Sequence, residues 1–250
     1  MIVTESSIDI ETPSGAMRTY TYAPVSPVKG ASPRWPGIVL YSEIFQQTQP
    51  IKRLAITFAS SGLVVFVPEV YHSQEKPGTV LGYDDRGKDR GNALKKLISI
   101  DVFDADTKAA LDALEKHAQC NGTLGALGVC LGGHLAFRAG FDPRVKGTAC
   151  FFPTDVHTGT LGREQAARTL ERCGEISGEL LMVWGRQDPH IPADGRRKIY
   201  DALLAAERVY TWHEFNAEHA FLRDEGSRWD PAVGQLCRAI AFDFFARTLR

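Results

Sequence analysis

Two kinds of pattern alternate along the chain: short continuous runs of apolar residues and longer stretches with helical spacing. A continuous apolar run is typical of a strand that is covered on both faces, as in a parallel sheet. Apolar residues three and four positions apart indicate an amphipathic helix. On this basis we predict strands over Gly37–Tyr41, Leu63–Val67, Leu124–Val129, Val145–Phe152, Leu180–Trp184 and Val209–Phe215.

The stretches between and after these strands predict helices. They cover Pro50–Ser60, Asp101–His117, Gly132–Ala139, Asp194–Ala206 and Pro231–Leu249. Before the first buried run, Ile8–Glu11 and Thr19–Tyr22 alternate polar and apolar residues around a Pro-Ser-Gly turn, which predicts an antiparallel hairpin. Buried strands separated by helices favour an α/β fold with a mostly parallel sheet of about eight strands and helices on both faces.

Residues 71–100 interrupt this regular alternation. The segment is polar and rich in glycine and charge, which indicates an excursion over the sheet and not a further layer of it. No repeat, low-complexity tract or linker divides the chain. We therefore expect one domain over residues 1–250, a length that α/β folds commonly use as a single unit.

The charges of the chain are balanced. Lys and Arg number 29 and Asp and Glu number 30, so the net charge is −1 and no basic excess favours nucleic acid or a membrane surface. The N-terminus lacks a cationic segment leading into an apolar one, and the longest apolar runs are far shorter than the ~20 residues that cross a bilayer. We expect a cytoplasmic protein that binds a small-molecule substrate, with no nucleic-acid or membrane partner, as a monomer or weak homodimer.

The five cysteines, at positions 120, 130, 150, 173 and 237, are odd in number and contain no Cys-x-x-Cys pair. This pattern disfavours a disulfide framework and a zinc ribbon, and it suits a reducing compartment. The chain also lacks a phosphate-binding loop, a His-Glu-x-x-His motif and a dinucleotide-binding turn. We therefore expect no cofactor and no metal.

The most specific motif is Gly-Val-Cys130-Leu-Gly-Gly, which directly follows a predicted strand and opens a helix. This context matches the nucleophile elbow Gly-x-Ser-x-Gly, with cysteine in the place of serine. The helix N-terminus favours the thiolate, and the amide of Leu131 would point at a developing oxyanion. The alternative is a structural cysteine in a glycine-rich junction, because free cysteine is among the most buried residue types.

Two further loops supply the partners that a nucleophile needs. Asp188 follows the strand Leu180–Trp184, and His219 follows Val209–Phe215. The chain order Cys130, Asp188, His219 is the nucleophile–acid–base order of the α/β-hydrolase fold. An aspartate in a turn is usually a cap, but three such residues in this order, each after a strand, predict a triad. The other six histidines lack this setting: His72, His117, His134, His157, His190 and His213.

With these motifs the chain resembles the dienelactone hydrolase (carboxymethylenebutenolidase) family. The resemblance extends from about Gly37 to the C-terminal helix. It rests on the elbow around Cys130, on Gln-Asp188-Pro-His-Ile-Pro, on Glu-His219-Ala-Phe-Leu-Arg223 and on Ser-Glu43-Ile-Phe.

The resemblance implies roles for further residues. Glu43 would hold the resting thiol and help it to ionise when substrate arrives, and the amide of Ile44 would be the second oxyanion donor. Arg223 would bind a substrate carboxylate. A second arginine is expected in the excursion, where Arg90 is better placed than Arg86.

Three functions are then open. The first is a cysteine-dependent hydrolase that opens a small anionic lactone or enol ester through a thioester. The second is a broader carboxylesterase or thioesterase on the same triad. The third is a non-catalytic, redox-sensitive binding protein with Cys130 as the sensor, for which an intact triad would be unnecessary.

Overall fold

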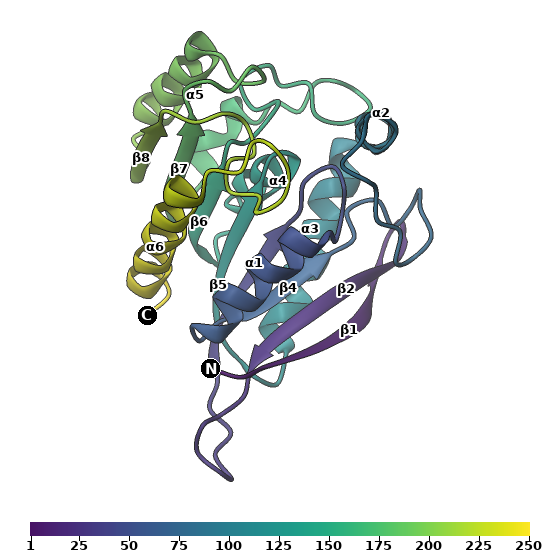
Figure 1. Ribbon diagram of the computed structural model, residues 1–250, viewed down its shortest axis with the longest axis vertical. Helices are drawn as coiled ribbons and strands as arrows, with labels where there is room; N and C mark the ends of the chain where they lie inside the picture. Colours follow the sequence, from purple (N-terminus) through teal and green to yellow (C-terminus); the bar gives the residue numbers. More distant parts are fainter.

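The computed structural model describes residues 1–250, and one eight-stranded sheet runs through the whole molecule (Figure 1). The strands lie in the order β1-β2-β4-β3-β5-β6-β7-β8. β2 pairs antiparallel with β1 and β4, and all other pairs are parallel. The bounds are β1 Val3–Thr12, β2 Gly15–Pro24, β3 Trp35–Tyr41, β4 Val64–Pro68, β5 Cys120–Val129, β6 Val145–Phe151, β7 Glu179–Gly185 and β8 Tyr210–Phe215.

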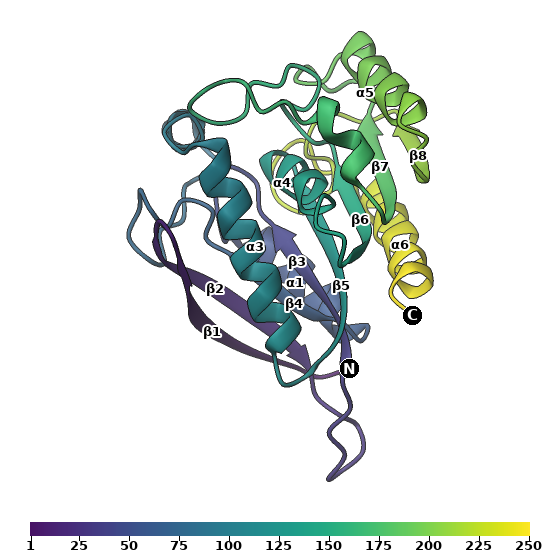
Figure 2. The same ribbon diagram turned by 180° about the vertical axis from the view of Figure 1, so that it is seen from behind.

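Helices cover both faces of the sheet. α1 (Gln49–Ser60) and α6 (Pro231–Thr248) lie on the face that is turned forward in Figure 1, where Phe58 of α1 packs against Phe242 and Phe245 of α6. α3 (Ile100–Lys116), α4 (Leu131–Ala139) and α5 (Ala193–Ala205) lie on the opposite face, seen in Figure 2. A single cluster of 65 buried apolar residues fills both interfaces. The predicted α/β-hydrolase fold is confirmed.

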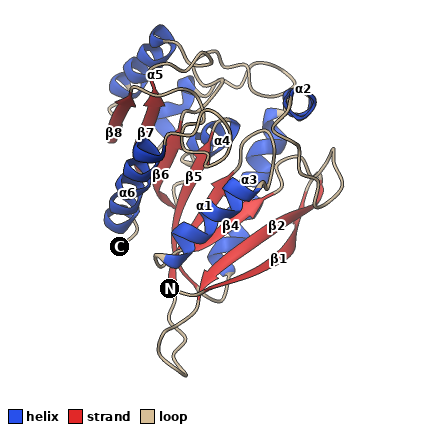
Figure 3. Ribbon diagram, in the orientation of Figure 1, coloured by secondary structure: helices blue, strands red, loops and turns tan.

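The predicted strands and helices recur in the structure with small shifts at their ends (Figure 3). The hairpin strands are longer than predicted, because polar residues at the sheet edge continue the pairing beyond the alternating segments. None of the helices combines the length and the apolar character that crossing a bilayer requires.

The excursion contains a helix that the sequence pattern did not predict, α2 (Asp85–Leu94). Its buried residues are Gly87, Gly91 and Leu94, so it lacks the apolar stripe that marks an amphipathic helix. The helix begins at a local signal instead, because the side chain of Asp84 accepts a hydrogen bond from the amide of Gly87 at 2.7 Å.

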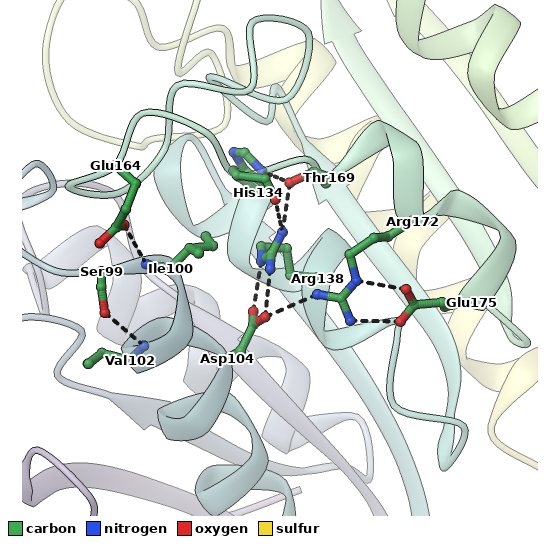
Figure 4. A network of polar contacts seen from close by, with 11 residues as sticks. Ser99, Ile100, Val102, Asp104, His134, Arg138, Glu164, Thr169, Arg172 and Glu175 are labelled. Atoms are coloured by element: carbon green, nitrogen blue, oxygen red, sulfur yellow. Dashed lines mark hydrogen bonds and ion pairs between the residues drawn. The ribbon is translucent and has the colours of Figure 1, made fainter.

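A partly buried ionic network holds the helix that follows Cys130 (Figure 4). Arg138 of α4 forms a two-pronged contact with Asp104 of α3, with N···O distances of 2.7 and 2.6 Å. Arg172, from the 3-10 helix Leu170–Glu175, contacts the same carboxylate at 3.1 Å. Bidentate arginine–carboxylate pairs impose geometry as well as energy. The network therefore holds the last turn of α4 against α3.

Candidate active site

Cys130 occupies the sharp turn between β5 and α4, with φ 59° and ψ −122°. The strand and the helix approach so closely here that side chains have no room on either side of the cysteine. A Cβ on Gly128 would lie 1.9 Å from the carbonyl oxygen of Gly132, and one on Gly132 would lie 2.1 Å from that of Tyr41. The Gly-x-Cys-x-Gly pattern is thus a packing requirement of the strained turn.

Hydrogen bonds from the neighbouring strand hold the Cys130 backbone in this conformation. Its amide donates to the carbonyl of Phe151 at 3.1 Å, and its carbonyl accepts from the amides of Gly133 and Thr154 at 3.0 and 3.2 Å. Leu131 is the first residue of α4, where amides have no partner within the helix. The Leu131 amide is therefore available to an oxyanion formed beside the sulfur.

His219 and Asp188 lie in the loops after β8 and β7, at the same carboxyl edge of the sheet as Cys130. Asp188 Oδ2 contacts His219 Nδ1 at 2.6 Å. The other carboxylate oxygen accepts the backbone amide of His190 at 2.8 Å. Both carboxylate oxygens of Asp188 are therefore held by hydrogen bonds. Asp188 in turn fixes the ring of His219 and leaves Nε2 of that ring free to act on another group.

The electrostatic surroundings of His219 favour its protonated form. Burial lowers the pKa of its imidazole, but the Cys130 thiolate and the hydrogen bond with Asp188 outweigh that effect and raise the pKa. A hydrogen bond with the Cys130 side chain contributes in the same direction. The structure thus brings Cys130, His219 and Asp188 together in one chain of interactions.

Aromatic rings complete the walls around His219. Phe152 and His190 both meet its imidazole edge to face, with ring centroids at 5.0 and 4.7 Å. Phe152 is buried, whereas His190 is exposed. The imidazole of His219 is therefore confined to one orientation by two rings and a carboxylate.

Glu43 is buried beside Arg223 and Tyr83. Its carboxylate oxygens lie 3.7 Å from Arg223 Nη1 and 3.1 Å from the donating Tyr83 hydroxyl. Burial raises the pKa of Glu43, and the charges of Arg223 and His219 oppose that shift. Arg223 also stacks over the Tyr83 ring at 4.1 Å, which holds the guanidinium against the carboxylate.

Ile44, the residue after Glu43, is positioned by the excursion. Helix α2 comes so close that a Cβ on Gly91 would lie 2.5 Å from the Ile44 carbonyl oxygen. The amide of Leu81 donates to the Phe45 carbonyl at 3.1 Å, and Gln46 Nε2 donates to the Thr79 carbonyl at 3.1 Å. The excursion thus fixes the loop that carries the second proposed oxyanion donor.

A small cavity of about 20 Å³ opens beside these residues. Its polar lining consists of Glu43 and Arg223, and its remaining walls are mainly apolar. The full lining is Glu43, Pro50, Ile51, Leu54, Val129, Phe152, Leu222 and Arg223. No group of three or more histidine, cysteine or acidic side chains is arranged to hold a metal ion.

Comparison with known proteins assigns the chain to a family. The model of the dienelactone hydrolase family matches residues 17–249. A Saccharomyces cerevisiae protein named "Putative carboxymethylenebutenolidase" is 40% identical and aligns with 100% of this chain and 94% of its own length. The carboxymethylenebutenolidase of Pseudomonas putida is 25% identical over 88% of each chain. The chain belongs to the dienelactone hydrolase family.

Solved structures agree with this assignment at the level of the fold. The crystal structure of a "Putative Dienelactone Hydrolase" from Klebsiella pneumoniae superimposes with a TM-score of 0.84 at 19% identity, over 99% of this chain and 100% of the other. Family and relatives together make this protein a hydrolase of carboxylic esters or lactones. The non-catalytic sensor considered from the sequence is therefore set aside.

The structure places Arg90 away from the cluster of Cys130, His219 and Asp188. The Arg90 side chain is half exposed on α2 and pairs with Glu75, with an N···O distance of 2.5 Å. Together with Arg86 it lines a separate surface hollow. Arg90 and Arg223 therefore do not share a cavity, because α2 turns this face of the helix outward.

Sequence reasoning missed two residues of the candidate site, Tyr83 and His190. Tyr83 is the single aromatic residue between His72 and Phe103, an unusual position in a polar segment that could have drawn attention to it. His190 lies only two residues after Asp188 and lacks the setting after a strand that pointed to His219. Its backbone amide, not its ring, contacts Asp188, and the ring is thereby free to pack on His219.

Proposed function

We propose that this enzyme hydrolyses a small anionic lactone or enol ester through a thioester on Cys130. The observation that carries the proposal is the position of His219 between the Cys130 side chain and Asp188 Oδ2. A histidine that is fixed by a carboxylate on one nitrogen can exchange a proton with a nucleophile on the other. Cytoplasmic location and the absence of a cofactor remain parts of this proposal.

In the first step the Cys130 thiolate attacks the ester carbonyl carbon, and the negative charge moves to the carbonyl oxygen. The amides of Leu131 and Ile44 stabilise that oxyanion. The tetrahedral intermediate then collapses: the carbon–oxygen bond to the leaving group breaks, and the His219 imidazolium donates its proton to the departing oxygen. In a lactone this oxygen stays in the same molecule as the new thioester.

In the second step water attacks the thioester while neutral His219 accepts its proton. The carbon–sulfur bond breaks, the carboxylic acid leaves, and Cys130 returns as a thiolate beside the imidazolium. Asp188 stabilises the imidazolium in both steps without changing its own protonation state. A thiolate suits activated esters with good leaving groups, so amides would be poor substrates.

Arg223 supports the preference for an anion. It is 15% exposed, faces the cavity and has Glu43 as its partner in the structure. A substrate carboxylate would compete with Glu43 for the guanidinium, because arginine pairs well with planar carboxylates. Displaced from Arg223, the Glu43 carboxylate would stabilise the imidazolium that forms when the Cys130 thiol passes its proton to His219, which is the help with ionisation that the family resemblance implies.

The second candidate is a broader carboxylesterase or thioesterase on the same triad. The lining of the cavity favours it, because Ile51, Leu54 and Leu222 are apolar and Arg223 is its single cation. A neutral acyl chain would find contacts along α1 in such a cavity.

A substrate comparison with two arginine variants separates these candidates. For Arg223→Ala we expect kcat/KM on cis- and trans-dienelactone to fall about 10- to 100-fold, the value of a hydrogen bond to a charged group, while neutral aryl esters change little. Arg90→Ala is the matched control, since Arg90 lies outside the cavity, and it should leave both substrate classes unchanged. An equal loss on both classes for Arg223→Ala would favour the broader esterase.

A further inference from the structure

The two edges of the sheet are protected very differently. β1 carries three acids, Glu5, Asp9 and Glu11, of which Glu5 pairs with Lys52 and Asp9 with Arg18. Such a row of charged side chains on an edge strand opposes pairing with another chain. β8, the opposite edge, has the sequence Tyr-Thr-Trp-His-Glu-Phe, without lysine, proline or a bulge. Its single acid, Glu214, is neutralised by Arg196 at 3.4 Å.

The outer side of β8 offers unpaired backbone groups. The carbonyl of Val209 accepts from Leu180 of β7 at 3.0 Å, and that of Phe215 accepts from Arg186, directly after β7, at 2.7 Å. Odd-numbered residues of β8 therefore face β7. By the alternation of a strand, Tyr210, Trp212 and Glu214 turn their N–H and C=O groups outward. No element lies beyond β8 in either view of the fold (Figures 1 and 2).

Apolar surface surrounds this open edge. Leu204 at the end of α5 is 59% exposed and Val209 before β8 is 67% exposed. Tyr200 of α5 is 39% exposed and packs edge to face on Tyr210 and Trp212. On the other face of β8, a groove of about 400 Å³ lies between the strand and α6, lined by Leu181, Thr211, His213, Ala239, Ile240, Asp243, Phe244 and Arg247.

We propose that a second copy of this chain pairs with β8, antiparallel and about a two-fold axis at Trp212, to join two sheets into one. A two-fold contact requires a patch that matches itself, and β8 meets this requirement. With Trp212 opposite Trp212 of the second copy, Tyr210 lies opposite Glu214 of that copy. All three outward residues then exchange backbone hydrogen bonds, whereas any shifted register leaves some of them unpaired.

The charges around β8 fit the same arrangement. Arg186, 67% exposed, lies beside Glu214 at the C-terminal end of the strand, whereas Asp201 acts on Tyr210 at its N-terminal end. The two-fold axis exchanges these ends, so Asp201 approaches Arg186 of the second copy. The two Glu214 side chains stay four residues apart along the ladder, roughly 14 Å, and do not repel each other strongly.

Sedimentation velocity over a dilution series tests the proposal. We expect the native enzyme to reach twice the protomer mass as concentration rises and to dissociate reversibly on dilution. Trp212→Lys places two ammonium groups face to face at the axis, and Tyr210→Pro removes an outward N–H that β7 does not use. Each should raise the dimer dissociation constant at least about tenfold, or ~1.4 kcal/mol.

Ile8→Lys, at a 38% exposed position of β1, is the matched control on the other sheet edge and should leave the mass unchanged. Thermal melting and turnover of a neutral aryl ester verify that each variant is folded. A native enzyme that stays a monomer at every concentration overturns the proposal. So does a dimer that both folded β8 variants leave intact. Turnover per protomer should be the same whether the enzyme is a monomer or a dimer, so this test is separate from that of the proposed hydrolysis.

Discussion

Two clusters in this molecule combine the same three kinds of group: a potential nucleophile, a histidine and an aspartate. One is Cys130, His219 and Asp188. The other is Ser14, His72 and Asp106, which join the β1–β2 turn, the start of the excursion and α3. Both lie largely out of solvent, with side-chain exposures of 6% for His219 and 1% for His72.

The clusters differ in which atoms of the histidine are used. In the first, Asp188 binds Nδ1 and leaves the other nitrogen for the thiol. In the second, Asp106 at 2.9 Å and Ser14 at 3.3 Å both contact Nε2, while Nδ1 is buried without a partner. A base must be oriented through one nitrogen and accept a proton through the other, so His72 cannot activate Ser14 as a triad histidine would.

The two clusters also differ in the backbone conformation at the potential nucleophile. Ser14 sits in a hairpin turn, with no helix N-terminus and no strained elbow to expose its oxygen. Cys130 has a positive φ directly before a helix. The comparison teaches that a catalytic triad is defined by geometry and not by the presence of its residue types. Substitutions at matching positions of the two clusters test this distinction.

The largest expected difference between the clusters appears when the potential nucleophile of each is replaced. Cys130→Ala should lower kcat on aryl esters by about 10⁴-fold or more, because the covalent step disappears. Ser14→Ala, in the matching position of the second cluster, should leave turnover within a factor of two of wild type. Steady-state kinetics measure both. Rapid quenching and mass spectrometry should find an acyl adduct on Cys130 in the wild type and none in Cys130→Ala.

A Cys130→Ala variant that keeps its activity would remove the proposed mechanism entirely. A comparable loss in Ser14→Ala, with an unchanged melting temperature, would instead show that the second cluster takes part in catalysis.

The sequence contained enough to predict the first cluster but not to dismiss the second. Cys130, Asp188 and His219 each follow a predicted strand, and the carboxyl ends of parallel strands meet at one edge. Tyr83 and His190 could not be placed, because the path of the excursion and the rotation of a ring depend on tertiary packing. The position of Arg90 on the outer face of α2 could not be predicted either, because it depends on the packing of α2 against Ile44.

The two aspartates provide the next contrast. Asp188→Asn should lower kcat about 10⁴-fold, as loss of the orienting carboxylate does in a triad. It should also shift the alkaline limb of the kcat/KM profile to lower pH: the carboxylate raises the pKa of His219, and without it the imidazolium loses its proton earlier. Activity against pH for both enzymes measures the shift.

Asp106→Asn is the control in the second cluster. It should leave the pH profile unchanged and lower the free energy of unfolding by ~1–3 kcal/mol, the cost of an impaired buried hydrogen bond. Denaturant titration measures that loss. If Asp188→Asn changed stability alone and not the pH profile, the two clusters would be alike and both structural.

The smallest expected effect concerns His190, for which the second cluster has no counterpart. Its ring packs on His219 with centroids 4.7 Å apart, and such aromatic pairs contribute ~0.5–1.5 kcal/mol. His190→Ala should therefore lower kcat/KM about two- to tenfold, because the base gains rotational freedom. His190→Phe keeps a ring in that place and should recover most of the loss. If kcat/KM of His190→Phe were as low as that of His190→Ala, catalysis would require the imidazole itself at this position and not only the packing of a ring.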